Sequence, residues 1–318
     1  MRQRSDERGL RGESAAELWP PLRRFVEIDA RIGRWAVEGG PFRRFFYEFI
    51  RFGLKQAWAC LFGGVMLALV LATRLFYPPD AALSRYDFLF LAALGVQAAL
   101  LLLRFESVTE AGVIFLFHLV GVVMELFKTA HGAWVYPETA FFRIDGVPLF
   151  TGFMYACVGS YMMRAWELFD FRFRNHPPMW QVSLLAVAIY VNFFAHHYVA
   201  DMRAALFVAT AALFWRTTIY YRIHHCWRTM PLLLAAFLAS CFIWLAENAS
   251  TYSHIWLYPN QLNAWRPVGL GKLGSWFLLQ IVSYAMVALV CKPQPPSEAP
   301  LTRSRARHDD RLRAGLSA

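Results

Sequence analysis

Long uncharged apolar stretches constrain this chain more than any other feature of its sequence. A helix that crosses a membrane needs about 20 largely apolar residues, and six stretches approach that length without a charged residue. Two more qualify if Glu125 is accepted near the end of one and Arg216 extends to the interface from the other. The sequence therefore predicts about eight transmembrane helices, at 56–73, 88–103, 111–127, 146–163, 177–195, 204–221, 229–246 and 273–291.

The composition agrees with an all-α, polytopic membrane protein. Hydrophobic residues make up 58% of the 318 residues and charged residues 17%, whereas soluble domains carry roughly 25% charged residues. The net charge of +10 would suggest nucleic acid in a soluble protein. Here the arginines lie in tails and loops between apolar stretches, so we interpret the charge as a signal of membrane orientation and expect membrane lipids, not nucleic acid, as partners.

The distribution of lysine and arginine predicts that both termini are cytoplasmic. Of the 32 such residues, 12 precede Gln56 and six follow Cys291, and positive charge accumulates on the cytoplasmic side. We expect the inner membrane of a bacterium. Residues 1–54 form a basic arm in which 21–52 combine apolar residues at helical spacing with arginines, as interfacial amphipathic helices do. Residues 292–318 are rich in Pro and Arg and are predicted to be a disordered cytoplasmic tail.

The membrane domain, 55–291, contains an internal repeat. Displacement of the chain against itself by 122 residues aligns Glu125 with Glu247 and gives E-x3-T-x4-W-x-Y-P in both copies. Each copy closes a set of four predicted spans, so the two sets have the same orientation. We therefore expect two parallel four-helix halves, at about 55–170 and 177–291, as in several transporter folds.

The chain resembles the uncharacterised bacterial multipass membrane family catalogued as domain of unknown function 817. The resemblance covers roughly residues 50–292, implies a bacterial multipass protein and implies no activity. It rests on the motifs FKTAHGAWVYPE (127–138), GVPLFTGFMYACVGSYMMRAW (146–166), YVNFFAHHYVADMR (190–203), MPLLL (230–234), WLAEN (244–248) and YPNQ (258–261).

Two glutamates are the first candidates for chemistry, because ionisable groups within a bilayer are costly. Glu125 and Glu247 lie near the outer ends of their predicted spans. Lys128, three residues after Glu125, is the expected structural partner of that carboxylate. Glu247 has no such neighbour and is either a functional acid or one member of an interhelical pair. The repeated Trp134, Tyr136, Trp256 and Tyr258 are candidate binding residues, although such residues also anchor helices at the interface.

Histidines supply a metal hypothesis. His196, His197 and Asp201 are candidate ligands for zinc or iron, because His197 and Asp201 are four residues apart and share a helical face. The alternative is an ordinary pair at a helix end. His131 and His254, which we expect on the same outer face, are further candidate binding residues.

These residues lead to one main hypothesis and two alternatives. Because the unusual polar residues gather on one predicted face, we expect an outward-facing site that binds or modifies a lipid or isoprenoid-like amphiphile. A secondary transporter of parallel repeats would instead need polar groups at the middle of the membrane, where the candidates are Gln97, His118, Asn192, Thr210 and Gln280. A scaffold or assembly factor would need no site. Walker, GxGxxG and GxSxG motifs are missing from the sequence, which argues against ATPases, dinucleotide enzymes and α/β-hydrolases.

Overall fold

The computed structural model describes residues 31–32, 35, 39–223 and 227–296. The predicted disordered tail lies almost wholly outside this part of the chain, as does most of the predicted interfacial helix before Gly39. The chain divides into two compact units, Met1–Leu54 and Lys55–Ala318, and we describe each by itself.

Helix α3, Pro41–Ala59, begins in the first unit and is amphipathic. Phe42, Phe45, Phe46 and Phe49 recur at helical spacing and are all exposed, at 57–79% of their maximal areas. Arg43, Arg44 and Arg51 accompany them on the same helix. An exposed aromatic stripe beside arginines is typical of an amphipathic helix, and the interfacial position of this helix stays a prediction.

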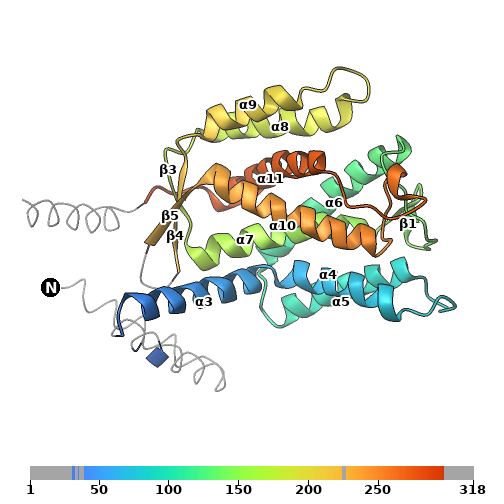
Figure 1. Cartoon of the computed structure of the whole chain (residues 1–318), viewed down its shortest axis with the longest axis horizontal. Coiled ribbons are helices and arrows are strands. Elements are labelled where there is room, and N and C mark those ends of the chain that lie inside the picture. The colour runs from blue at the N-terminus through green and yellow to red at the C-terminus, as the bar shows by residue number, and fades with distance from the viewer. Residues whose placement is uncertain (1–30, 33–34, 36–38, 224–226, 297–318) are drawn as a thin grey trace, which may run out of the picture. The chain divides into compact units, whose positions relative to one another are not determined.

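The second unit is mostly helical (Figure 1). Its helices run side by side, with the three-stranded sheet at one end and the long loops at the other (Figure 1). The helices are α4 (Leu61–Phe76), α5 (Arg85–Leu102), α6 (Val108–Ala130), α7 (Phe150–Phe169), α8 (Met179–Ala195), α9 (Arg203–Phe214), α10 (Leu232–Tyr252) and α11 (Leu270–Cys291), with the 3-10 turn η1 at Pro259–Gln261.

Within the described residues, four helices are long and apolar enough to cross a membrane, namely α5, α6, α10 and α11. Helices α3 and α4, which break at Cys60, pass the same test only as a pair and would supply a fifth span. The shorter α8 and α9 are apolar but have only 17 and 12 residues. These spans identify an integral membrane protein with four to five candidate crossings.

Strands correct the prediction of an all-α fold. The predicted stretch at 204–221 is helical only to Phe214, because Thr218–Arg222 forms β4, and the stretch at 229–246 starts within β5, Trp227–Pro231. Together with β3, Arg172–Arg174, these strands form an antiparallel sheet in the order β3-β4-β5. The sequence TIYYR of β4 consists mainly of β-branched and aromatic residues, which favour strands. Because this sequence is also apolar, the predicted helix was extended through it.

A second, smaller departure precedes α7. The short strands β1 (Arg143–Ile144) and β2 (Val147–Pro148) pair through Asp145-Gly146. Both turn residues have positive φ, 47° and 83°, as a tight two-residue hairpin requires. Helix α7 therefore begins at Phe150, four residues after the predicted start of that span.

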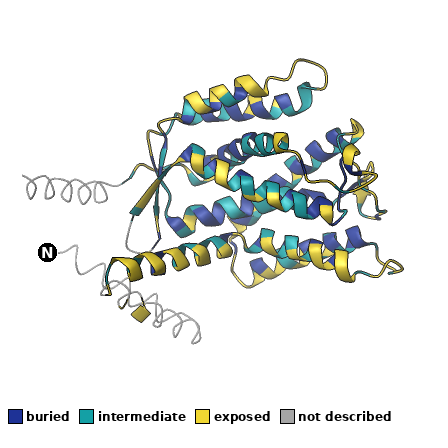
Figure 2. Cartoon of the chain, viewed as in Figure 1, coloured by how far each residue is buried: buried dark blue, intermediate teal, exposed yellow. Residues whose placement is uncertain are grey.

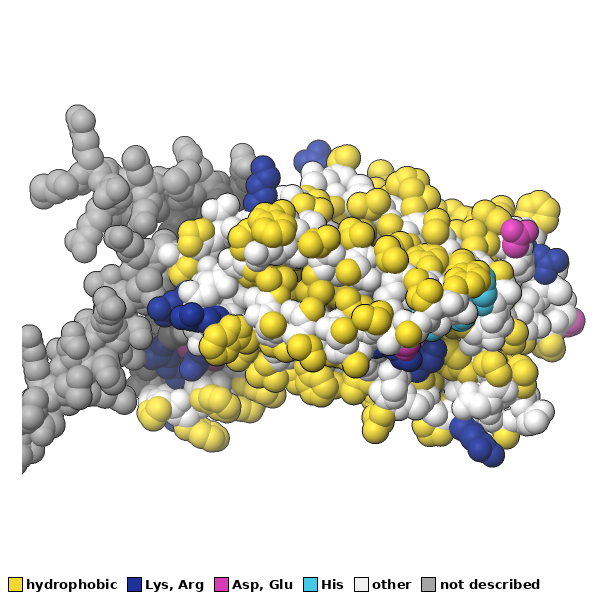
Figure 3. All heavy atoms as spheres, turned by 90° about the horizontal axis from the view of Figure 1, so that it is seen from above, with side chains coloured by type: hydrophobic (Ala, Val, Ile, Leu, Met, Phe, Trp, Pro, Cys, Tyr) yellow, Lys and Arg dark blue, Asp and Glu magenta, His cyan; other side chains and the backbone are white. Residues whose placement is uncertain are grey.

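The interior is centred on α7 and α11, whose buried residues exceed those of α8 and α9 (Figure 2). Helix α7 packs closely on α6. At Gly152, a Cβ atom would lie 2.4 Å from Nδ1 of His118, so the two helices approach at a distance that a larger residue would not allow. On the face shown in Figure 3, hydrophobic side chains dominate the middle and most of the charged ones lie towards the two ends. This is the surface that a bilayer-spanning bundle needs.

Candidate functional site

Glu125 lies at the centre of the first polar cluster, near the end of α6. Glu125 is buried, with 2% of its surface exposed. Oε2 accepts hydrogen bonds from Trp134 Nε1 at 2.8 Å and Tyr136 OH at 2.6 Å, and Oε1 accepts one from Tyr155 OH at 2.7 Å. Three neutral donors from two different segments therefore hold one carboxylate.

Glu247 lies in a matching cluster near the end of α10 and is 3% exposed. Its Oε1 accepts a hydrogen bond from Tyr258 OH at 2.5 Å, and its Oε2 accepts one from Trp276 Nε1 at 2.7 Å. In both clusters the tyrosine follows the glutamate by eleven residues. The loop after each helix therefore folds back so that its tyrosine meets the carboxylate.

The two loops contact each other at the repeated motif. Val135 and Leu257, which are 122 residues apart, form an antiparallel bridge with both N···O distances at 2.9 Å. The ring of Trp134 meets the ring of Tyr258 edge-on, with the ring centroids 6.1 Å apart. The loop of each cluster therefore also braces the other cluster.

Lys272 joins the two clusters, and sequence reasoning missed it. Its Nζ lies 4.2 Å from the centroid of the Tyr258 ring and 5.5 Å from that of Trp134, a cation–π arrangement with both rings. It contributes electrostatically to Glu125 and to Glu247. Tyr155 and Trp276 were missed as well, because they lie on α7 and α11, outside the repeated motif that contains the glutamates.

The tyrosines act as hydrogen-bond donors in this site. Burial and the adjacent Glu125 raise the pKa of the Tyr136 hydroxyl well above its usual value. Burial and Glu247 do the same for the pKa of Tyr258. Because these hydroxyls stay protonated, each donates its hydrogen bond to the neighbouring carboxylate. Each carboxylate is the acceptor in every hydrogen bond described here. Trp134, Tyr136 and Tyr258 therefore support the carboxylates and do more than anchor helices at the membrane interface.

The expected pairing of Glu125 with Lys128 is wrong. All three donors to Glu125 are neutral, and Lys128 instead points to two histidines on the segment that follows α8. Lys128 Nζ lies 3.0 Å from His197 Nε2 and 3.4 Å from His196 Nε2. Lys128 and Glu125 therefore belong to different clusters, although they are three residues apart.

The candidate metal ligands do not come together in the described part of the chain, where no group of three His, Cys, Asp or Glu side chains has a geometry that could hold a metal ion. Lys128, a cation, meets His196 and His197, while Asp201 forms an ion pair with Arg203 at 2.5 Å. Asn192 also donates to Asp201, at 3.3 Å. A zinc or iron site here stays a prediction, and this geometry does not favour it.

The remaining predicted residues occupy separate positions. His131 is exposed beside His197, with their ring centroids 4.9 Å apart. His254 follows α10 and has Arg74, Arg85 and Glu138 as its electrostatic neighbours. Trp256 is buried at 8% exposure, within the hydrophobic cluster that includes Tyr86 and Phe150. The structure thus separates the predicted outer site into a carboxylate centre, a lysine–histidine cluster and isolated residues.

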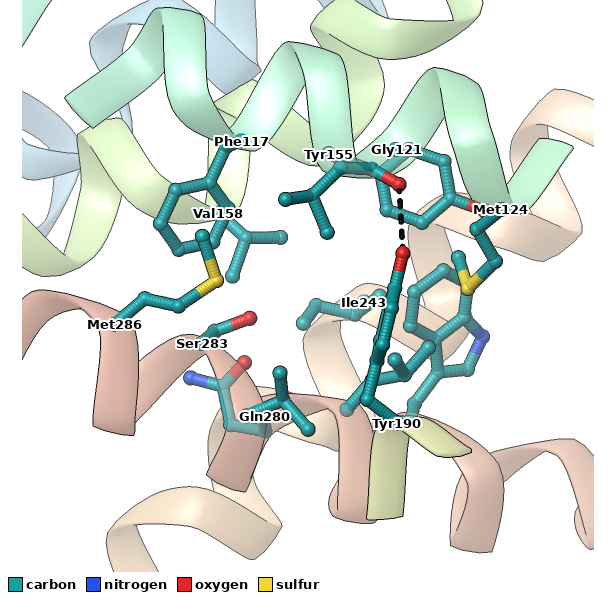
Figure 4. A pocket seen from close by; sticks show the side chains of 14 residues that line it. Phe117, Gly121, Met124, Tyr155, Val158, Tyr190, Ile243, Gln280, Ser283 and Met286 are labelled. Atoms are coloured by element: carbon teal, nitrogen blue, oxygen red, sulfur yellow. Dashed lines mark hydrogen bonds between the residues drawn. The ribbon is translucent and has the colours of Figure 1, made fainter. Parts of the chain in front are cut away.

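A cavity lies next to the carboxylate centre, among helices α6, α7, α8, α10 and α11 (Figure 4). The cavity volume is about 30 Å³, and its lining is mainly apolar. Tyr155 and Trp276, which hold the two carboxylates, form part of its wall. The other lining residues are Phe117, Val120, Gly121, Met124, Val158, Tyr190, Ile243, Leu279, Gln280, Val282, Ser283 and Met286.

Gln280, in the lining of this cavity, has a buried polar atom that lacks a protein partner in the described part of the chain. Gln280 is 2% exposed, and its Oε1 is buried without a hydrogen bond among the described residues. A buried unsatisfied acceptor costs about 1–3 kcal/mol. Asn192 and Thr210, two other candidates for the middle of the membrane, are satisfied by Asp201 and by the backbone of Leu206. Gln280 therefore differs from them in offering a free acceptor to a cavity.

Comparison with known proteins places the chain among bacterial relatives. Residues 48–284 match the model of a family described as "Protein of unknown function (DUF817)". The "Uncharacterized protein YoaT" of Bacillus subtilis strain 168 is 40% identical over 259 residues, which are 81% of this chain and 97% of that protein. Among solved structures, MvINS, an Insig homolog from Mycobacterium vanbaalenii, is 13% identical with a TM-score of 0.43. The match covers 59% of this chain and 98% of that one. A cross-linked MvINS trimer gives 15% and 0.41.

Proposed function

The chain belongs to the DUF817 family, and from the geometry of its own residues we propose that it binds a lipid or isoprenoid-like amphiphile inside the membrane. The occupied site is the cavity beside the two carboxylates. The ligand has an apolar body and one hydrogen-bond donor, such as a hydroxyl group. The observation that carries this proposal is the unpaired Gln280 Oε1 within an otherwise apolar lining.

The chemistry of the lining supports a ligand of this class. Met124, Met286 and Phe117 offer apolar and adaptable surface. Gln280 and Ser283, one turn apart on α11, lie on the same side of the cavity (Figure 4). A hydroxyl that donates to Gln280 Oε1 would satisfy the buried acceptor, and the apolar body would lie against the apolar lining.

The neighbouring carboxylates give the ligand a route to affect the outer loops. Tyr155 and Trp276 contact the cavity with their rings and bind Glu125 and Glu247 with their polar atoms. A ligand that displaces either ring would also disturb the hydrogen bonds of the adjacent carboxylate. We therefore propose that occupancy of the cavity controls the arrangement of the loops that carry the repeated motif.

Photocrosslinking tests this proposal directly. A geranylgeraniol analogue with a diazirine on its chain is added to purified protein in detergent, and labelled peptides are identified by mass spectrometry. We expect labelling on α6 and α11. Ile243→Trp, which fills the cavity, should reduce labelling about tenfold or more, since a clash of a few kcal/mol opposes binding.

The matched control is Leu245→Trp, because Leu245 lies on the same helix but is 54% exposed. This variant should label as the wild type does. Gln280→Leu should weaken labelling by the alcohol and leave labelling by the corresponding hydrocarbon unchanged. Equal labelling of wild type and Ile243→Trp would rule out the cavity as the binding site.

For the topology, we propose eight spans in two parallel halves, with both termini on the cytoplasmic side of a bacterial inner membrane. Equivalent partners at an offset of 122 residues support the repeat. They are α6 with α10, α7 with α11, and the bridged Val135 with Leu257. Trp180, Leu184, Val187 and Val191 support α8 as a span, because they form an exposed apolar stripe at helical spacing.

Accessibility to a membrane-impermeant maleimide tests this topology in intact cells. Thr139→Cys and Asn175→Cys, in a background without native cysteines, place one thiol in each type of loop. We expect labelling of Thr139→Cys from outside, and labelling of Asn175→Cys only after the cells are opened. Labelling of both from outside would contradict parallel halves of four spans.

A further inference from the structure

Lys128 is a buried ammonium group without a carboxylate partner. The residue is 5% exposed, and none of the ion pairs among the described residues includes it. A buried charge is costly unless it is paired. The carboxyl end of α6 offers only the partial negative charge of a helix terminus.

The two histidines that meet Lys128 face its ammonium group with their Nε2 atoms. His196 Nδ1 lies 3.0 Å from the backbone oxygen of Asn192, and a carbonyl oxygen can only accept, so Nδ1 carries the proton. Because an ammonium group can only donate, the Nε2 atom that faces Lys128 is the acceptor in this contact. Desolvation lowers the pKa of His197, and the nearby Lys128 lowers it further. The contacts of Lys128 thus solvate its positive charge but do not neutralise it.

Further cations surround this group. Lys272 and Arg203 act electrostatically on Lys128, and Asp201 is the acid among its electrostatic neighbours. Asp201 already forms an ion pair with Arg203 at 2.5 Å. Lys272 has Glu247 and Glu125 among its own electrostatic neighbours, so Lys128 is the member of this group that is left without a dedicated carboxylate among the described residues.

The cluster is open on one side. His131 and His197 are exposed, and the His131 ring stacks on Phe127 with a centroid distance of 4.1 Å. His131 Nδ1 lies 2.8 Å from the backbone oxygen of Phe127, and Nε2 accepts from Tyr198 OH at 2.7 Å. The His131 ring is therefore held in a fixed orientation at the accessible edge of the cluster, and the His197 ring is held there by its contact with Lys128.

We propose that Lys128, His131, His196 and His197 form a binding site for a phosphate group, with Lys272 adding long-range attraction. Phosphate fits better than a metal ion, because the most buried member of the cluster is itself a cation. Phosphate oxygens accept hydrogen bonds from an ammonium group, and Lys128 has a third N–H besides the two that face His196 and His197. The group belongs either to free phosphate or to the headgroup of a lipid, and the site does not depend on the apolar cavity.

Thermal unfolding of the full-length protein in detergent tests this inference, with inorganic phosphate as the probe and chloride at equal ionic strength as the reference. Ligand that binds only the folded state raises Tm. We expect phosphate to raise the Tm of the wild type by several degrees. Lys128→Met, which keeps most of the side-chain volume, should lose this shift. Arg266→Met, at an exposed position in the outer loops, should keep it.

A second arm separates the two sources of phosphate. In nanodiscs with phosphatidic acid, compared with phosphatidylcholine alone, a Tm increase that Lys128→Met removes identifies a lipid headgroup. If Lys128→Met does not fold, His197→Asn, at an exposed position, should reduce the phosphate shift at least twofold. The inference is overturned if neither form of phosphate raises Tm, or if the shift is the same in the wild type and in the variants of the cluster.

Discussion

The surroundings of Glu125 and Glu247 share one plan and differ in their basic residues. Both carboxylates accept from a tyrosine eleven residues later and from an indole. Around Glu125, however, Tyr155 adds a third donor, and Lys128 and His131 follow. The positions 122 residues after these two are Ser250 and Ser253, both buried. Ser253 Oγ donates back to the helix at Ala249 O, 2.8 Å away. The common plan supports structure, and the basic residues that differ belong to the proposed phosphate site.

The largest expected effect comes from removal of the carboxylates. Glu125→Ala leaves three buried donors without an acceptor, and Glu247→Ala leaves two. We expect Glu125→Ala to lower the free energy of unfolding by about 2–5 kcal/mol and Glu247→Ala by less. Denaturation in mixed detergent micelles measures both. Glu→Gln variants, which keep one acceptor oxygen, should lie between. A larger loss for Glu247→Ala would show that the number of donors does not set the difference.

The next effect concerns the space that Tyr155 occupies. A Cβ atom at Gly121 would lie 2.6 Å from the Tyr155 ring, while the position 122 residues later holds Ile243. Gly121→Ala should therefore displace Tyr155 from Glu125 and lower the unfolding free energy by about 1–3 kcal/mol. Gly112→Ala on the same helix has no neighbour within 4 Å and should be neutral or stabilising, since alanine favours helices. If both variants unfold at the same temperature, Tyr155 is not constrained in this way.

A smaller effect of opposite sign is expected at Lys128. Lys128→Ser introduces the residue found at the corresponding position of the other cluster and removes a buried charge. In buffer without phosphate, we expect unfolding free energy to stay constant or to rise by up to about 1 kcal/mol. A loss of more than about 2 kcal/mol would mean that Lys128 stabilises the fold through contacts with His196 and His197.

The smallest effect is expected for the exposed ion pair of Asp201 and Arg203. Their side chains are 31% and 46% exposed, and such pairs contribute about 0–1 kcal/mol. Asp201→Asn should therefore change Tm little, and Arg203→Gln should behave alike. A large loss in Asp201→Asn alone would indicate a second role for this carboxylate, such as the metal ligand predicted from the sequence.

Much of the fold follows from the sequence, because apolar length determines where helices cross a bilayer. Each predicted stretch contains most of one helix, including Leu270–Cys291 for the last. Strand β4 was missed because hydropathy does not distinguish TIYYR from the end of an apolar helix. The signal for β1 and β2 was present in Asp145-Gly146, a sequence typical of tight hairpins.

The candidate site was predictable only in part. The motif E-x3-T-x4-W-x-Y-P contains the glutamate and two of its partners, Trp134 and Tyr136. Trp and Tyr are also common at membrane interfaces, where they anchor helices. The sequence therefore did not show that these two side chains donate hydrogen bonds to Glu125. Tyr155 and Trp276 could not be assigned, because their contacts depend on how α7 and α11 pack. The sequence predicted that Lys128 pairs with Glu125, the nearest acidic residue along the chain. Its partners in the structure, His196 and His197, are about 70 residues away.

The bridge between Val135 and Leu257 has a consequence for amide hydrogen exchange. Each residue donates its N–H to the other's carbonyl at 2.9 Å, so one opening event exposes both amide protons to solvent. Two hydrogen bonds alone would not protect these amides from exchange. Their protection therefore reports how firmly the carboxylates hold the two loops. The two amides should have equal protection factors, and loss of either glutamate should lower both together.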